Sequence, residues 1–160
     1  MGIRERIRAQ WSRDRELWWR HPFPGGEPAL GSCQMAVRVL VVDDHEPFRR
    51  AARAVIEETA GFELAGEAAD GEASIAAAKS LHPDIVLMDI NLPGINGLDA
   101  TRRILALVPS ALILLVSARD SHEFARQASD CGAAGYLPKS LLSPAQLAEI
   151  WASARGSDGA

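Results

Sequence analysis

The sequence contains a short, uninterrupted apolar run, Ile85 to Met88, that ends at a single carboxylate, Asp89. Alternate side chains of a strand point to opposite faces, so a run that is apolar at every position predicts a strand covered on both faces. Such strands are typical of parallel sheets with helices above and below. Asp89 then lies at the carboxyl end of a central strand, where open α/β sheets bind their ligands. A turn or helix-capping role is the alternative for an Asp at this place.

Strand and helix patterns alternate five times between residues 37 and 154. The predicted strands are 37–42, 62–68, 85–88, 111–117 and 134–138. The predicted helices, which have apolar residues at helical spacing, are 47–60, 72–81, 98–108, 122–131 and 144–154. Because crossovers between parallel strands are right-handed, these five βα units predict an α/β fold with a doubly wound parallel sheet of order 2-1-3-4-5, the flavodoxin-like (βα)5 class.

Length and composition limit the class of protein. A chain of 160 residues with 48% hydrophobic residues is expected to form one domain with a sizeable core. No apolar run approaches the roughly 20 residues that a membrane span needs, and no signal peptide opens the chain. Cys33 and Cys131 are too isolated for a disulfide framework or a metal site, so we expect reduced thiols. We therefore expect a cytoplasmic protein that does not bind membranes.

Polar side chains follow the strands of this predicted sheet. Asp43 and Asp44 follow the first strand, Asp89 ends the third, Ser117 ends the fourth, and Lys139 follows the fifth. The first and third strands are neighbours in the order 2-1-3-4-5, so the three carboxylates are expected to converge at the point where ligands bind. Each residue has a structural alternative when it is taken singly: a helix-start acid for Asp44, a surface lysine for Lys139 and a capping hydroxyl for Ser117.

Three neighbouring carboxylates repel one another, and at least one pKa rises unless a cation is present. Mg²⁺ suits such a site because it prefers oxygen ligands, retains waters and needs only one or two carboxylates plus a phosphate. Ca²⁺ suits it less well, since no loop supplies six to eight oxygens. Lys139 and Ser117 would add a cation and a hydroxyl, which phosphoryl transfer requires. The resulting hypothesis is that Asp89 is phosphorylated.

Four motifs occur in an order and spacing that resemble a known family. They are VLVVDDHEPFRR, IVLMDINLPGINGL, LLVSA and GYLPKS. The sequence from residue 36 to residue 154 resembles the receiver domain of two-component response regulators. The residues of these motifs are most similar to those of receivers of the NarL/FixJ-like class, which usually precede a helix-turn-helix DNA-binding domain.

The resemblance implies a role for each residue of the site. Asp89 matches the phosphoacceptor, which takes its phosphoryl group from a phosphohistidine of a sensor histidine kinase or a phosphotransfer protein. Asp43 and Asp44, with Asp89 and the backbone carbonyl of Asn91, match the Mg²⁺ ligands. Lys139 matches the lysine that contacts the phosphoryl oxygens.

The resemblance also implies residues that respond to phosphorylation. Ser117 matches the switch hydroxyl, and Tyr136 matches the aromatic switch, with a strand aromatic that does not rearrange as the alternative. Asn91 and Arg119 occupy the two positions whose side chains tune hydrolysis of the aspartyl phosphate. The implied protein is a phosphoacceptor switch, and it is not an enzyme acting on other substrates.

The expected output follows from the charge and from the chain end. Residues 36–160 carry 11 Lys and Arg against 17 acids, and the chain stops at Ala160, soon after the last predicted helix. We therefore expect a stand-alone receiver without direct nucleic acid binding. Its output would be an unknown downstream protein partner, a homodimer or onward phosphotransfer. The alternatives are a phosphorylation-independent interaction module and an orphaned receiver of a DNA-binding regulator that lost its output domain.

Residues 1–35 differ from the rest of the chain. They carry six Arg against four acids and end in a Pro- and Gly-rich stretch, HPFPGGEPALGSC. We interpret them as a disordered extension or a misread start, because Met35 stands where such receivers normally begin. An amphipathic helix with its apolar residues on one face is the alternative. The predicted domains are thus the extension 1–35, the receiver 36–154 and a short tail 155–160.

Overall fold

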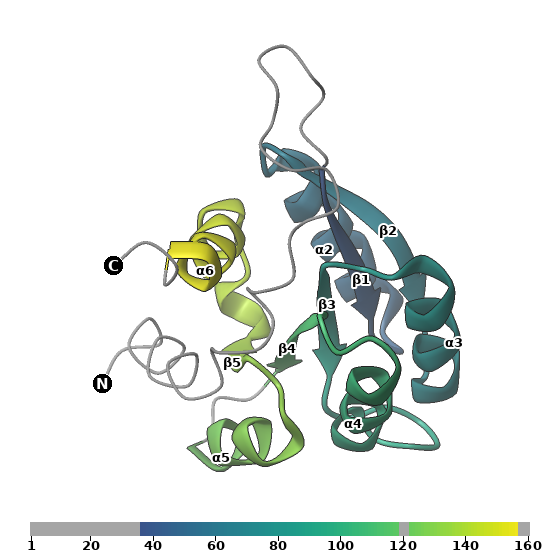
Figure 1. The fold of residues 1–160 in the computed structure, drawn as a ribbon. Helices are drawn as coiled ribbons and strands as arrows, with labels where there is room; N and C mark the ends of the chain where they lie inside the picture. The colour runs from purple at the N-terminus through teal and green to yellow at the C-terminus, as the bar shows by residue number, and fades with distance from the viewer. Residues whose placement is uncertain (1–35, 119–121, 157–160) are drawn as a thin grey trace.

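The computed structural model of the protein describes residues 36–118 and 122–156, and in these ranges strands and helices alternate as predicted (Figure 1). The strands are β1 (Val37–Val42), β2 (Phe62–Ala68), β3 (Ile85–Asp89), β4 (Leu112–Ser117) and β5 (Gly135–Pro138). The helices are α2 (Glu46–Glu58), α3 (Gly71–Leu81), α4 (Gly97–Leu107), α5 (His122–Cys131), α6 (Pro144–Gly156) and the 3-10 helix η1 (Lys139–Leu141). The extension 1–35 lies outside the described residues.

All strands of the sheet are parallel, and their order is β2-β1-β3-β4-β5, which confirms the predicted topology. The register aligns Val42 of β1 with Met88 of β3, so the residues that follow them, Asp43 and Asp89, lie at the same edge. Asp89 itself is aligned with Val116 of β4. The carboxyl ends of β1, β3 and β4 therefore meet at one edge of the sheet.

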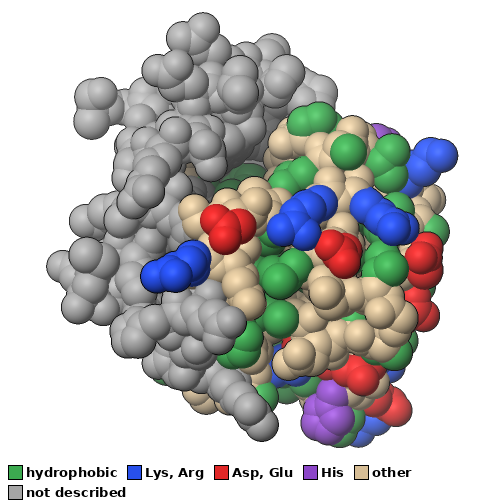
Figure 2. All heavy atoms as spheres, turned by 90° about the horizontal axis from the view of Figure 1, so that it is seen from below, with side chains coloured by type: hydrophobic (Ala, Val, Ile, Leu, Met, Phe, Trp, Pro, Cys, Tyr) green, Lys and Arg blue, Asp and Glu red, His purple; other side chains and the backbone are tan. Residues whose placement is uncertain are grey.

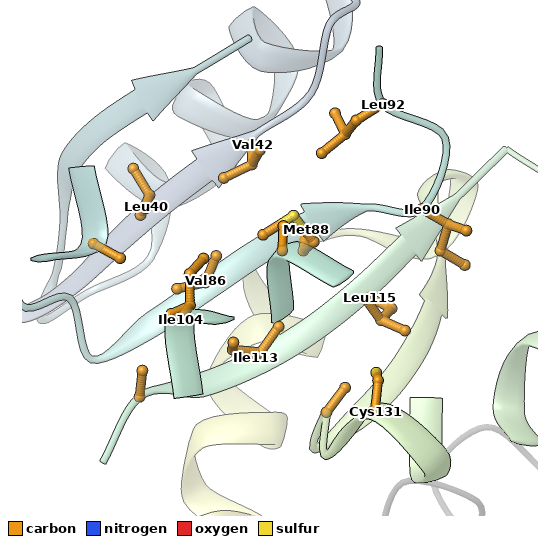
Figure 3. Packing of buried hydrophobic residues seen from close by; sticks show 14 of the residues in the cluster. Leu40, Val42, Val86, Met88, Ile90, Leu92, Ile104, Ile113, Leu115 and Cys131 are labelled. Atoms are coloured by element: carbon orange, nitrogen blue, oxygen red, sulfur yellow. The ribbon is translucent and has the colours of Figure 1, made fainter. Parts of the chain in front are cut away.

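Helices cover both faces of the sheet. On one face, α3, α4 and α5 pack on alternate strand residues, and Figure 3 shows Ile104 of α4 beside Val86 and Ile113 of the strands. On the other face, α2 and α6 pack on the intervening residues of the same strands. Residues 85–89 are buried at every position, as expected for a strand with helices on both sides.

Capping residues and a proline fix the starts of the helices that follow the carboxyl ends of the strands. Asn96 caps α4, since its side-chain oxygen accepts a hydrogen bond from the backbone N–H of Asp99 at 2.9 Å. Asp70 caps α3 in the same way through Ala73 at 2.7 Å. Such caps contribute about 1 kcal/mol each. Pro47 lies in the first turn of α2, where its missing N–H costs no hydrogen bond.

The differences from the predicted elements are small. Helix α6 extends two residues past Ala154, and η1 follows β5 directly, closed by a hydrogen bond from the Leu142 N–H to the Lys139 carbonyl. Across residues 36–118 and 122–156, none of the helices has the length and apolar character that crossing a membrane requires. The described part of the face in Figure 2 mixes basic, acidic and hydrophobic side chains, without a continuous basic stripe.

Candidate functional site

The predicted carboxylates do converge at the carboxyl edge of the sheet. Oxygen atoms of Asp43, Asp44 and Asp89 all lie within 4.8 Å of one another. Asp43 is fully buried and Asp89 is only 5% exposed, whereas Asp44 is exposed. The edge thus combines two buried carboxylates with one that water reaches.

Asp43 is held by contacts to the start of α2 and to η1. Its Oδ1 accepts a hydrogen bond from the backbone N–H of His45 at 2.8 Å. Its Oδ2 accepts no hydrogen bond from the described residues but is ion-paired with Nζ of Lys139. The Arg49 guanidinium donates to the backbone carbonyl of Asp43 at 2.6 Å, and its Nε is 3.7 Å from Oε1 of Glu67. These contacts fix the acidic loop that follows β1.

Lys139 lies between the two buried carboxylates. Besides its pairing with Asp43, its Nζ is 3.7 Å from Oδ2 of Asp89. Its side chain is 17% exposed, and the ammonium lies 4.6 Å from the centre of the Phe48 ring. The charge of Lys139 is therefore directed at the carboxylates and largely withdrawn from water.

Asp89 has an altered acidity. Burial, then the charge of Asp43 and, more weakly, the charge of Asp44 raise its pKa from 3.8 to about 6. Lys139 and the backbone N–H of Asn91 act in the opposite direction. That N–H lies 3.4 Å from Oδ1 of Asp89. Burial together with repulsion from Asp43 and Asp44 thus outweighs the effect of the single ammonium on this pKa. The repulsion is what the sequence predicts for clustered carboxylates without a metal.

The turn behind Asp89 explains two glycines of the motif. Gly94 has a positive φ of 76°, which favours glycine. Gly97 begins α4 in contact with the strand end, and a Cβ at this position would lie 2.1 Å from the Asp89 carbonyl oxygen. Its N–H donates to the carbonyl of Ile90 at 2.9 Å. Only glycine lets α4 start this close behind the acid.

The remaining predicted residues have different placements. Ser117 is buried and follows Val116, the residue aligned with Asp89. Tyr136 is buried among the residues under α5, with its ring 5.6 Å from that of Phe124. The side chain of Asn91 is exposed. Arg119 lies outside the described residues.

The donor set fits a magnesium ion. Mg²⁺ binds oxygen at 2.0–2.1 Å, so opposite ligands in its octahedron are about 4 Å apart. The 4.8 Å spread of the carboxylates is close to this value, so one or two could bind directly and another through water. No nitrogen or sulfur ligand enters this group of described residues, which suits a hard cation.

Comparison with known proteins identifies the fold family. The family model for the response regulator receiver domain matches residues 39–151. The chain belongs to this family. Response regulator GacA of Pseudomonas viridiflava is 40% identical to the receiver over 103 residues, which cover 64% of this chain and 48% of GacA. The chain thus spans about half the length of the curated relatives it matches.

Solved receiver structures are also similar. A LuxR-family two-component response regulator from Aurantimonas sp. SI85-9A1 is 38% identical, with a TM-score of 0.69 over 76% of this chain and 86% of that chain. A chain of the CheX-CheY-BeF3-Mg²⁺ complex of Borrelia burgdorferi is 25% identical, with a TM-score of 0.65 over 72% and 87% of the two chains. Receiver domains bind Mg²⁺ at an acidic site and interact with histidine kinases or phosphotransfer proteins.

Sequence reasoning missed three contributors to the site. In the sequence, Phe48 belongs to the apolar face of the predicted helix 47–60 and Gly97 to the turn that closes behind Asp89, and neither these two nor Arg49 has a predicted contact at the site. For Gly97 the signal was present, since a glycine that opens a helix directly behind a strand often marks a close backbone approach. Phe48 and Arg49 contact partners from other elements, and helical spacing does not reveal such partners.

Proposed function

We propose that this receiver is a phosphorylation switch whose Asp89 accepts a phosphoryl group in a Mg²⁺-dependent reaction. The single observation that carries the proposal is the buried Asp89 carboxylate, with two further carboxylates and one ammonium gathered around it. A purely structural site gains nothing from mutually repelling buried acids, because each costs free energy without a cation. The site has this arrangement at the edge where α/β sheets bind ligands.

In the proposed step, a carboxylate oxygen of Asp89 attacks the phosphorus of a phosphohistidine on a kinase or phosphotransfer protein. An O–P bond forms and the P–N bond breaks, with its electron pair passing to the imidazole nitrogen. Asp43, Asp44, Asp89 and the backbone carbonyl of Asn91 are the proposed Mg²⁺ ligands. A bound Mg²⁺ supplies positive charge to the phosphoryl oxygens.

Other residues of the chain are proposed to contact the phosphoryl group or to respond to it. Lys139, already 3.7 Å from Asp89, is proposed to contact a phosphoryl oxygen. Ser117 is proposed as the hydroxyl that moves toward the phosphoryl group, and Tyr136 as the aromatic residue that follows it. Asn91 and Arg119 are proposed to tune hydrolysis of the aspartyl phosphate.

The test is intact-mass spectrometry after incubation with acetyl phosphate, with Mg²⁺ or with a chelator. We expect wild-type protein to gain one phosphoryl group only with Mg²⁺, and Asp89→Asn to gain none. Asp99→Asn is the matched control, because Asp99 is an exposed aspartate on α4 that pairs with Arg102 outside the site. It should be phosphorylated as wild type is.

Failure of wild-type protein to gain a phosphoryl group would overturn the proposal and favour a phosphorylation-independent interaction module. The analogue BeF3⁻ extends the test, because a solved relative carries BeF3 and Mg²⁺ in its complex. Chemical-shift changes that BeF3⁻ and Mg²⁺ cause together in wild type, but not in Asp89→Asn, would support the same site.

The output of the switch is proposed to be a change in protein contacts, through a downstream partner or a homodimer. Residues 36–154 are proposed as the receiver unit, with 1–35 and 155–160 flanking it. Gel filtration with BeF3⁻ and Mg²⁺ distinguishes the two outputs, because only homodimerisation changes the size of the isolated protein.

A further inference from the structure

Phe48 makes an unusual contact for a residue on the apolar face of α2. It lies in the first turn of the helix, one turn before Ala52 and two before Ile56, both of which are buried against the sheet. Phe48 is only partly buried, and its ring faces the Lys139 ammonium at 4.6 Å. The contact joins residues 91 positions apart in the sequence, so neither element alone creates it.

The geometry gives Lys139 attractive surroundings on two sides. Asp43 and Asp89 attract its ammonium from one side, and the electron-rich face of the ring attracts it from another. The ammonium of a lysine sits at the end of a flexible four-carbon side chain, so it needs such partners to stay in one position. A leucine in place of Phe48 would fill similar space, but it has no quadrupole to attract a cation.

We propose that Phe48 is a positioning residue that holds the Lys139 ammonium in place for the phosphoryl group. This inference rests on the proposed phosphorylation of Asp89. Phe48 touches neither the phosphoryl group nor the metal ligands in this role, because it acts through Lys139. An ammonium misplaced by about 1 Å loses much of its effect on developing charge, which makes the rate sensitive to the ring.

A simpler role is packing alone, since Phe48 also contacts the apolar residues between α2 and the sheet. The two roles predict different substitution patterns. Packing alone predicts that leucine and tyrosine perturb the rate similarly. Positioning predicts that an aromatic ring preserves the rate and that an aliphatic side chain does not.

The first experiment measures the rate of phosphorylation by acetyl phosphate at saturating and limiting Mg²⁺. We expect Phe48→Leu to lower the rate about tenfold with the half-saturating Mg²⁺ concentration unchanged, and Phe48→Tyr to retain most of the rate. Phe62→Leu is the matched control, because Phe62 packs on the same apolar cluster but starts β2, at the opposite end of the sheet. Its rate should equal that of wild type.

A double-mutant cycle makes the test specific for Lys139. In a Lys139→Met background, Phe48→Leu should have no further effect on the rate, because the cation that the ring positions is gone. An undiminished loss in that background would overturn the proposal. So would equal rates for Phe48→Leu and Phe48→Tyr.

The second experiment does not depend on phosphorylation. The chain has two lysines, Lys79 and Lys139, so their ε-CH2 signals can be assigned directly by NMR. The ring should shift the Lys139 signal upfield of the exposed Lys79, and Phe48→Leu should abolish the difference while Phe48→Tyr keeps it. An unshifted Lys139 signal in the wild type refutes the positioning role. If the signal is shifted but acetyl phosphate fails to phosphorylate the protein, only the proposed function is refuted.

Discussion

Replacement of Asp89 by asparagine removes a charge that the folded protein tolerates poorly. The folded-state pKa is about 6 against an ordinary 3.8, chiefly because of burial and the charge of Asp43. A pKa shift of one unit corresponds to about 1.4 kcal/mol, so the ionised carboxylate lowers the free energy of unfolding by up to about 3 kcal/mol at neutral pH. Asparagine has the same shape without the charge. We expect Asp89→Asn to be more stable than wild type by about 2 kcal/mol when no divalent cation is present.

The pH dependence gives this prediction its sign. The folded protein binds the Asp89 proton more tightly than the unfolded chain does, so this group favours folding at low pH. Its contribution is lost as the pH rises from about 4 to about 6 and stays lost above that range. The difference in unfolding free energy between Asp89→Asn and wild type should therefore be small near pH 4 and reach its full size above pH 6.

The assay is urea unfolding followed by circular dichroism, with a chelator and across this pH range. Added Mg²⁺ should then stabilise wild type more than Asp89→Asn, because the variant lacks one proposed ligand. The difference in unfolding free energy between the two proteins should therefore become smaller. Asp99→Asn serves as the control for loss of an exposed acid. A variant less stable than wild type at neutral pH, or a difference that does not change with pH, would refute the electrostatic reasoning.

Three further substitutions test other parts of the structure by the same unfolding assay, with phosphorylation rates measured by incubation with acetyl phosphate. Lys139→Met leaves the buried Asp43 carboxylate without its cation and should cost about 3 kcal/mol, most of which Asp43→Asn should restore in the double variant. Gly97→Ala places a Cβ against the Asp89 carbonyl and should cost about 2 kcal/mol while slowing phosphorylation. Ile104→Ala opens a cavity in the fully buried core and should cost about 3 kcal/mol, with the phosphorylation rate nearly unchanged.

The sheet and the edge that carries the candidate site could be predicted from the sequence because a few physical rules determine them. The run before Asp89 is apolar on both faces of a strand, which predicts helices on both sides of the sheet. Residues 85–89 are indeed buried throughout. Right-handed crossovers then left one common order for five strands, which places β1 beside β3. Once these strands are neighbours and parallel, Asp43 and Asp89 must end at the same edge.

The sequence was less informative where two elements meet through side chains. The same spacing that places Phe48 above Ala52 on the apolar face of α2 also leaves its ring at the edge of the sheet, within reach of Lys139. The hydrogen bond from Arg49 to the Asp43 carbonyl likewise depends on how α2 returns over β1. Such contacts depend on the relative position of packed elements, and no periodicity within one element records that position.

Charge balance links the site to its proposed switching. Three carboxylates and the ammonium of Lys139 leave two negative charges, which one divalent cation neutralises. The proposed phosphorylation would replace the single charge of Asp89 by about two, so a site that holds the cation would then carry roughly one uncompensated negative charge. Hydrogen-bond donors near the edge are attracted to this charge, and Ser117, which follows the residue aligned with Asp89, is a hydroxyl donor at that position. We therefore expect phosphorylation to change the position of β4's end before that of any more distant element.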